Sequence, residues 1–194
     1  MIEEAGKQRR AEERLSECRA AGGRWLDLSG LGLRELPRGL GECAALEVLL
    51  VHGNRLESLA GVLAGLRRLR ILNLNANGIE DLAGELADCV DLVELHVYGN
   101  RLSALPAELG RMGRLEVLDV SDNRLVALRP EVGELRSLRK LDVSYNQLIE
   151  LPEGLAGLRQ LRELDLVGNQ FQGVPVVVSR LPRSCVVRLE GGIA

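Results

Sequence analysis

The chain contains two histidines, His52 and His96, which are its best candidates for metal binding or acid–base chemistry. Both fall on outward positions of expected strands, and one further strand lies between those two strands. Strand spacing then sets the two backbones about 10 Å apart. A metal site needs ligands that converge on one ion, and no cysteine lies beside either histidine. We therefore expect no metal site, no cofactor and no catalytic centre built on these residues.

The four cysteines, Cys18, Cys43, Cys89 and Cys185, are widely spaced and form no Cys-x-x-Cys pair. They are not clustered like the disulfide-bonded caps of extracellular repeat proteins. The opening segment MIEEAGKQRRAEERL is charged and resembles no signal peptide. No run of eighteen apolar residues is present, so no membrane span is expected. These observations favour a reduced, cytoplasmic protein.

Composition limits the choice of partner. The net charge of −3 gives no general attraction to nucleic acid or to anionic membranes. Arginines recur just before the expected strands, but acidic residues such as Glu116, Glu134 and Glu163 lie among them. We interpret this row of arginines as a solvent-exposed edge of the solenoid. With aromatic residues at only 2%, a stacking platform for single-stranded nucleic acid is also disfavoured.

The clearest feature of the sequence is an internal repeat of 23 residues without insertion or deletion. Each unit carries Leu-x-x-Leu-x-(Leu/Val)-x-x-Asn followed by another apolar residue. A degenerate unit starts at Gly23, and a half unit starts at Ser184. The six asparagines in register are Asn54, Asn77, Asn100, Asn123, Asn146 and Asn169.

Two spacings inside each unit predict its shape. Apolar residues alternate through Leu95-His96-Val97, as in a strand, and later ones recur at helical spacing, as in Leu105, Leu109 and Met112. One such coil is too thin to bury its own leucines, whereas stacked coils share a core and pair their strands in parallel. The asparagine follows the strand, where its amide can satisfy backbone groups left unpaired by the turn. The sequence therefore predicts an α/β solenoid with a parallel concave sheet.

Both ends of the array need cover. Residues 7–21 place Ala11, Leu15 and Cys18 on one face of an amphipathic helix that ends at two glycines. We expect residues 1–22 to form an N-terminal cap and residues 23–194 to form the solenoid, with seven repeats and a terminal half repeat. Residues 185–189 supply an eighth strand with a bare edge. This edge predicts either a monomer or weak self-association through the last coil.

The pattern Leu-x-x-Leu-x-Leu-x-x-Asn-x-Leu-x-x-Leu-Pro-x-x-Leu, nearly intact at 92–109 and 138–155, resembles the leucine-rich-repeat superfamily. The 23-residue Leu-Pro form is similar to intracellular Ras-group and Roco-type repeats and their bacterial relatives. The last coil is similar to that of secreted bacterial ubiquitin-ligase effectors. This resemblance implies a horseshoe-shaped solenoid that recognises other proteins.

The resemblance leaves an alternative open. In this alternative, the chain is the target-recognition part of a secreted bacterial effector of the ubiquitin-ligase type, translocated without a classical signal peptide, or of a Roco-type GTPase, and the catalytic domain is absent here. No G-x-x-x-x-G-K-[ST] motif is present, so no GTPase is expected here. Cys89-Val90-Asp91 matches the Cys-x-Asp motif of the ligases, but Cys89 occupies a repeat slot that points into the core. We therefore expect an inert thiol and no enzyme.

The residues that depart from the common repeat indicate where a partner binds. In the second to fourth coils, apolar, aromatic and hydrogen-bonding side chains replace the usual Leu-Asp-(Leu/Val)-Ser. Such mixed patches often bind proteins. In the later coils, an acidic column could steer a basic partner. The predicted partner-binding residues are Trp25, Val48, Leu50, His52, Ile71, Asn73, Asn75, Glu94, His96, Tyr98, Asp119, Asp142 and Asp165.

Two further points stay open from sequence alone. Trp25 either joins this patch or packs beneath the N-terminal helix, and the aliphatic residues either bind a partner or simply suit a sheet. The second and third coils read Leu59-Ala60 and Leu82-Ala83, and so lack the Leu-Pro step found in the first, fourth and sixth coils. We expect the convex sides of these two coils to be more helical.

Overall fold

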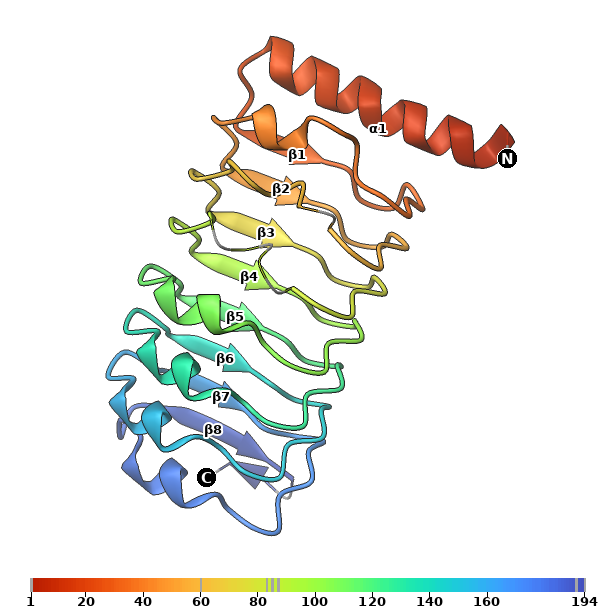
Figure 1. Ribbon diagram of the computed structural model, residues 1–194. Helices are drawn as coiled ribbons and strands as arrows, with labels where there is room; N and C mark the ends of the chain where they lie inside the picture. Colours follow the sequence, from red (N-terminus) through yellow and green to blue (C-terminus); the bar gives the residue numbers. More distant parts are fainter. Residues whose placement is uncertain are drawn as a thin grey trace.

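The computed structural model describes residues 2–59, 61–82, 84, 86, 88–190 and 192–193. They form a stack of coils that begins at a long helix and continues through one sheet whose strands follow chain order (Figure 1). The strands are β1 Trp25–Asp27, β2 Val48–Leu50, β3 Ile71–Asn73, β4 Glu94–His96, β5 Val117–Asp119, β6 Lys140–Asp142, β7 Glu163–Asp165, β8 Val186–Leu189 and β9 Gly192–Ile193. The predicted solenoid is confirmed.

Strand alternation fixes the register of this sheet. In β2 the central Leu49 is fully buried, while Val48 and Leu50 lie on the opposite, concave face. Each strand from β1 to β7 pairs in parallel with the next strand, and the paired residues are one repeat apart, as in Val48 beside Ile71. A residue that differs from the repeat consensus therefore lies beside the equivalent residue of the neighbouring coil.

The asparagines join neighbouring coils through backbone groups. Asn100 donates from Nδ2 to the carbonyls of Leu74 and Val97, both at 3.0 Å, and its Oδ1 accepts the N–H of Ile79 at 3.0 Å. Asn123 repeats this arrangement one coil later. The asparagine side chains are buried or half-buried, so they supply hydrogen bonds to the backbone groups of the turns from inside the stack. The predicted structural role of the asparagines is confirmed.

The convex side carries short 3₁₀ helices rather than α-helices. These helices recur at the same place in each coil except the second and third, where the described residues of the convex side form turns. The prediction of greater helicity there is wrong for these residues, while Ala60 and Ala83 lie outside the described part. Gly61 and Gly84 adopt positive φ values of 72°, which a continuing helix does not allow. The 3₁₀ helices are η1 Leu40–Glu42, η2 Ala107–Arg111, η3 Pro130–Glu134, η4 Glu153–Gly157 and η5 Val176–Arg180.

The N-terminal helix α1, Ile2–Ala20, covers the first coil and begins earlier than residue 7. Its end is fixed by Gly22, with φ of 57°, and by N–H bonds from Gly22 and Gly23 back to the last turn. Ala11, Leu15 and Cys18 are buried against the coil, as their spacing predicts. The helix shields hydrophobic side chains that would otherwise face water.

Side chains of α1 also close the free edge of β1. The Arg14 guanidinium donates to the Asp27 carbonyl at 2.8 Å, and the Cys18 thiol donates weakly to the Trp25 carbonyl at 3.7 Å. These acceptors would otherwise be available to a strand from another chain. The cap therefore protects the edge chemically as well as by covering apolar surface.

The other end of the sheet differs from the all-parallel prediction. The short β9 pairs antiparallel with β8, and Leu189 lies beside Gly192. A parallel strand needs a crossover of about a dozen residues, and only two residues separate β8 from β9. The last strand consequently reverses direction.

Candidate partner-binding surface

Three columns of side chains cross the concave face, because strands in register place equivalent residues side by side. The first column holds Trp25, Val48, Ile71, Glu94, Val117, Lys140, Glu163 and Val186. The middle column holds Asp27, Leu50, Asn73, His96, Asp119, Asp142, Asp165 and Arg188. The last column, just beyond the strands, contains Ser29, His52, Asn75, Tyr98, Ser121, Ser144 and Val167.

Four of the predicted residues form one contiguous apolar patch, defined as Trp25, Val48, Leu50 and Ile71. Trp25, Val48 and Ile71 are consecutive members of the first column, and Leu50 follows Val48 on the same face of β2. Trp25 is 57% exposed, so it does not pack beneath α1. It lines an open groove of about 410 Å³ between α1 and β1, together with Arg14 and Glu17. We call this set the concave apolar patch.

Polar side chains border this patch and are partly engaged within the protein. The Ser29 hydroxyl and His52 Nδ1 lie 2.8 Å apart, and His96 Nε2 lies 3.0 Å from Glu94 Oε2. Asn75 Oδ1 accepts the N–H of Tyr98 at 2.8 Å. The Tyr98 side chain is 45% exposed. The border thus combines fixed polar groups with one accessible aromatic ring.

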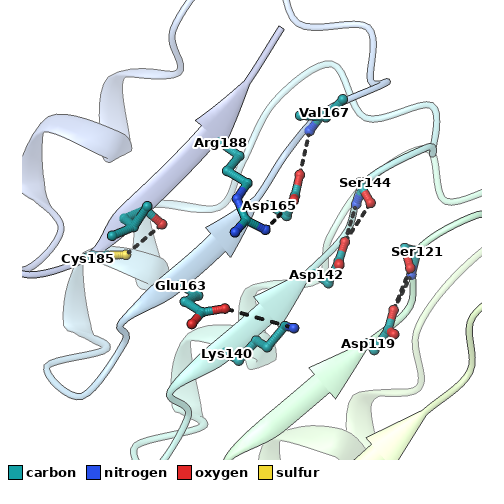
Figure 2. A network of polar contacts seen from close by, with 11 residues as sticks. Asp119, Ser121, Lys140, Asp142, Ser144, Glu163, Asp165, Val167, Cys185 and Arg188 are labelled. Carbon is teal, nitrogen blue, oxygen red and sulfur yellow. Dashed lines mark hydrogen bonds and ion pairs between the residues drawn. The ribbon is translucent and has the colours of Figure 1, made fainter. Parts of the chain in front are cut away.

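The middle column reveals a structural role for its aspartates. Asp119 Oδ1 accepts the N–H and hydroxyl of Ser121, at 3.1 and 2.5 Å, and Asp142 accepts the same pair from Ser144 (Figure 2). Asp165 accepts the N–H of Val167 at 3.1 Å. A carboxylate that accepts the N–H two residues later stabilises the turn out of the strand. These aspartates are therefore turn-forming residues first.

The same turn is built in two of the earlier coils. Asp27 bonds the N–H of Ser29, and Asn73 bonds the N–H of Asn75. Leu50 has no acceptor for this bond, and two positions after His96 the N–H of Tyr98 bonds to Asn75 Oδ1 instead. The sequence analysis missed this column-wide function, although an Asp or Asn at the same slot of five repeats signals it.

Charge is distributed unevenly along the column. Burial raises the pKa of Asp142, and the neighbouring charges of Asp119 and Asp165 raise it further against the opposing hydrogen bonds from Ser144. Arg188 lies 3.4 Å from Asp165, so the end of the column is partly neutralised (Figure 2). For Asp27, burial opposes ionisation, but hydrogen bonds from Ser29 and the charge of Arg14 outweigh it and lower the pKa.

A second apolar surface was not predicted from sequence. Val126, Ile149, Val174 and Val176 are each more than half exposed on the side of the later coils. The last three line a groove of about 320 Å³. Val126 and Ile149 occupy a slot that holds Arg34, Glu57, Glu80 and Ser103 in earlier coils, and this change was readable in the sequence. We call these four residues the lateral apolar patch.

The residues considered for catalysis or metal binding lie in different parts of the solenoid, with His52 and His96 on the concave face and Cys89 in the core. Cys89 is fully buried in the core, as its repeat slot predicts. Within the described residues, no group of three or more His, Cys, Asp or Glu side chains could hold a metal ion. The same residues include no helix with the length and apolar composition to cross a membrane.

Comparison with known proteins shows a family model and several solved structures that this chain resembles. Residues 113–171 match the family model described as leucine rich repeat. A leucine-rich-repeat protein of Leptospira interrogans superposes with a TM-score of 0.73 at 29% identity, over 86% of this chain and 48% of that one. No curated protein matches the chain significantly.

Two further structures share the fold. An internalin of Listeria monocytogenes gives a TM-score of 0.67 at 22% identity, over 78% of this chain and 43% of that one. The second structure is the repeat ectodomain of an Arabidopsis thaliana membrane receptor kinase, GASSHO1/SCHENGEN3, solved in complex with Casparian strip integrity factor 2. It superposes with a TM-score of 0.73 at 27% sequence identity, over 86% of this chain and 21% of that one. The chain thus spans less than half the length of each of the three structures. Its repeat, its six asparagines in register and these matches show that the chain has the leucine-rich-repeat solenoid fold.

Proposed function

We propose that this chain is a non-catalytic protein-binding module that grips a protein partner on the N-terminal half of its concave face. Leucine-rich-repeat folds are commonly used for protein–protein interaction, and the receptor ectodomain above was solved in such a complex. The finer assignment to the concave apolar patch is a proposal for this chain. It rests on the residues of that patch and on their neighbours.

Leu50 carries the proposal. Five coils use the equivalent position for an Asp or Asn that stabilises the turn, whereas coil two places a leucine there. This substitution gives up a local hydrogen bond and brings an apolar side chain beside Val48, on the open face of the sheet. Trp25 and Ile71 extend the apolar surface on both sides. Packing inside the solenoid does not require these side chains, so contact with a partner explains them best.

The surrounding groups indicate what the partner offers. His52, Asn73, Asn75, His96 and Tyr98 can form hydrogen bonds at the border, as is usual around an apolar interface centre. We propose that Asp119 and Asp142 attract a basic element of the partner, with Glu94 nearer the centre. Asp165 contributes less to this attraction because Arg188 neutralises part of its charge.

The test is a comparison of two triple variants in affinity capture. One carries Leu50→Glu, Ile71→Glu and Tyr98→Glu, and the matched control carries Val126→Glu, Ile149→Glu and Val176→Glu on the lateral apolar patch. Three contacts of the proposed surface at about 1–2 kcal/mol each predict a loss of binding of about 100-fold or more for the concave variant alone. Circular dichroism and thermal unfolding verify that both variants are folded. Equal capture by the two variants contradicts the assignment.

The alternative raised by the sequence, the recognition part of a secreted effector or of a Roco-type GTPase, rests on sequence resemblance alone. It uses the same binding surface and adds a catalytic domain outside residues 1–194. Sequencing the gene beyond codon 194 distinguishes it. A cytoplasmic location and a monomeric or weakly associating state likewise remain proposals, which fractionation and light scattering at several concentrations test.

A further inference from the structure

We infer that Cys18 and Cys43 form a disulfide that fastens the cap helix α1 to the first coil under oxidising conditions. Both cysteines are free thiols here. Cys18 lies on the buried face of α1, and Cys43 directly follows η1 of the first coil. The disulfide would therefore join two elements that are otherwise held by packing and polar contacts. The inference is independent of the proposed partner-binding function.

Adjacent residues set the approach of the two thiols. Arg19, next to Cys18, forms an ion pair with Glu42, next to Cys43. This contact aligns the end of α1 with the end of η1 at the position of the cysteines. Both side chains belong to one buried core cluster, where they are 9% and 7% exposed. Burial raises the pKa of the Cys43 thiol, and the neighbouring Cys18 raises it further.

Local geometry holds the Cys18 side chain in place. A β-carbon on Gly23 would lie 2.8 Å from Cys18 Sγ, so the glycine makes room for the sulfur. The Cys18 thiol bonds weakly to the carbonyls of Gly23 and Trp25, both at 3.7 Å. Oxidation removes this thiol hydrogen and replaces two weak bonds with a covalent one. Because Trp25 belongs to the concave apolar patch, the disulfide forms beside the proposed binding surface.

The oxidant is a low-molecular-weight disulfide, and the exchange is balanced in two steps. One protein thiolate attacks a sulfur of the small disulfide, breaks its S–S bond and releases one small thiolate. The second protein thiolate then attacks the protein sulfur of the mixed disulfide, which forms the protein disulfide and releases the other small thiolate. The two protons lost by the cysteines are taken up by the two released thiolates. The protein pair is oxidised by two electrons, and the small disulfide is reduced.

Tryptic mapping tests this pairing directly, because cleavage after arginine separates all four cysteines. Cys18 falls in residues 15–19, Cys43 in 39–55, Cys89 in 71–101 and Cys185 in 184–188. The intact protein is incubated with oxidised glutathione, in native buffer and in urea, before alkylation and mass spectrometry. Linkage of peptides 15–19 and 39–55 is expected, enriched on the order of tenfold in native buffer over urea. The native sample should also unfold at a higher temperature after oxidation.

Single variants provide the controls. Cys43→Ser should abolish both the linked peptide and the rise in unfolding temperature, whereas Cys89→Ser should preserve both. A second native sample is refolded from urea in the same glutathione buffer, so that burial cannot block access to the thiols. Glutathione adducts without the linked peptide, or equal linkage of all cysteine pairs in native and denatured samples, overturn the inference. No linkage after refolding overturns it as well.

Discussion

At the scale of single residues, the repeated asparagines bond to backbone groups inside the stack. Asn123 donates to the carbonyls of Val97, Val120 and Ser121 and accepts the N–H of Leu102. One side chain therefore serves backbone groups of two coils. Removing this side chain leaves these buried carbonyl and N–H groups without a hydrogen-bond partner.

Asn123→Ala is predicted to lower the free energy of unfolding by about 2–3 kcal/mol, since buried acceptors and a donor lose their partner. Urea denaturation followed by circular dichroism measures the change. Ser103→Ala, at an exposed position, is the control and should alter stability by less than about 0.5 kcal/mol. An Asn123→Ala variant as stable as this control contradicts the assigned role.

Asp142 shows how the column of aspartates affects stability. Its pKa is raised above the ordinary value of 3.8, chiefly by burial and then by Asp119 and Asp165. Between the ordinary and the raised pKa, the folded protein binds more protons than the unfolded chain, so stability falls as the pH rises through this window. At neutral pH the ionised group is therefore unfavourable.

Asp142→Asn is predicted to raise the unfolding temperature by a few degrees at pH 7, because it removes this charge while its amide oxygen still accepts from Ser144. The advantage should disappear below pH 3.8, where Asp142 itself is protonated. Glu57→Gln, an exposed residue outside the column, controls for the change in net charge. A variant that is less stable than the wild type at pH 7 and shows no pH dependence refutes this account.

At the scale of elements, the convex side depends on close contact between successive 3₁₀ helices. Gly133 of η3 is buried against Gly154 of η4. A β-carbon on Gly133 would lie 2.7 Å from backbone atoms of Gly154, which cannot move without displacing the whole coil. These two glycines therefore set how tightly the later coils stack.

Gly133→Ala is predicted to destabilise the protein by about 1–3 kcal/mol through overpacking. Gly113→Ala is the matched control, because its added β-carbon would meet no atom within 4 Å and its φ is not positive. Denaturant titrations of both variants measure the difference. Equal stability of the two alanine variants shows that the coils can separate at little cost.

The N-terminal cap shows an element with two functions. Leu15 and Ala11 cover the core of the first coil, as an amphipathic helix should. Arg14 and Cys18 additionally bond carbonyls on the free edge of β1. The inferred Cys18–Cys43 disulfide strengthens the same junction. The cap and the edge of the binding surface are thus coupled by direct contacts around Trp25.

At the scale of the whole molecule, the stack and its register could be predicted from spacing alone. A constant interval of 23 residues places Leu49 beside Leu72 and Leu72 beside Leu95, and leucines at these slots must be buried. The outward positions of Leu50, Ile71 and Asp142 follow from the same alternation. Their side-chain neighbours along the sheet were therefore predictable as well.

What was not predictable depends on local backbone geometry and on contacts between non-equivalent positions. Val174 occupies a slot where Leu151 and Leu128 are buried, but Gly173 with φ of 143° precedes it and Val174 is 61% exposed. The ion pair between Arg19 and Glu42 joins the helix to the first coil, so the repeat does not encode it. The reversal at β9 similarly depends on a short connection rather than on periodicity.

The most direct test of partner binding through the concave face is site-specific photo-crosslinking. A photoreactive amino acid replaces Leu50 in one protein and Gln160, an exposed residue between η4 and β7, in another. The account predicts a crosslinked partner protein from position 50 and none from position 160, with the Ile71→Glu variant abolishing the product. Crosslinking of the same protein from position 160 alone, or unchanged yield in the Ile71→Glu variant, would contradict it.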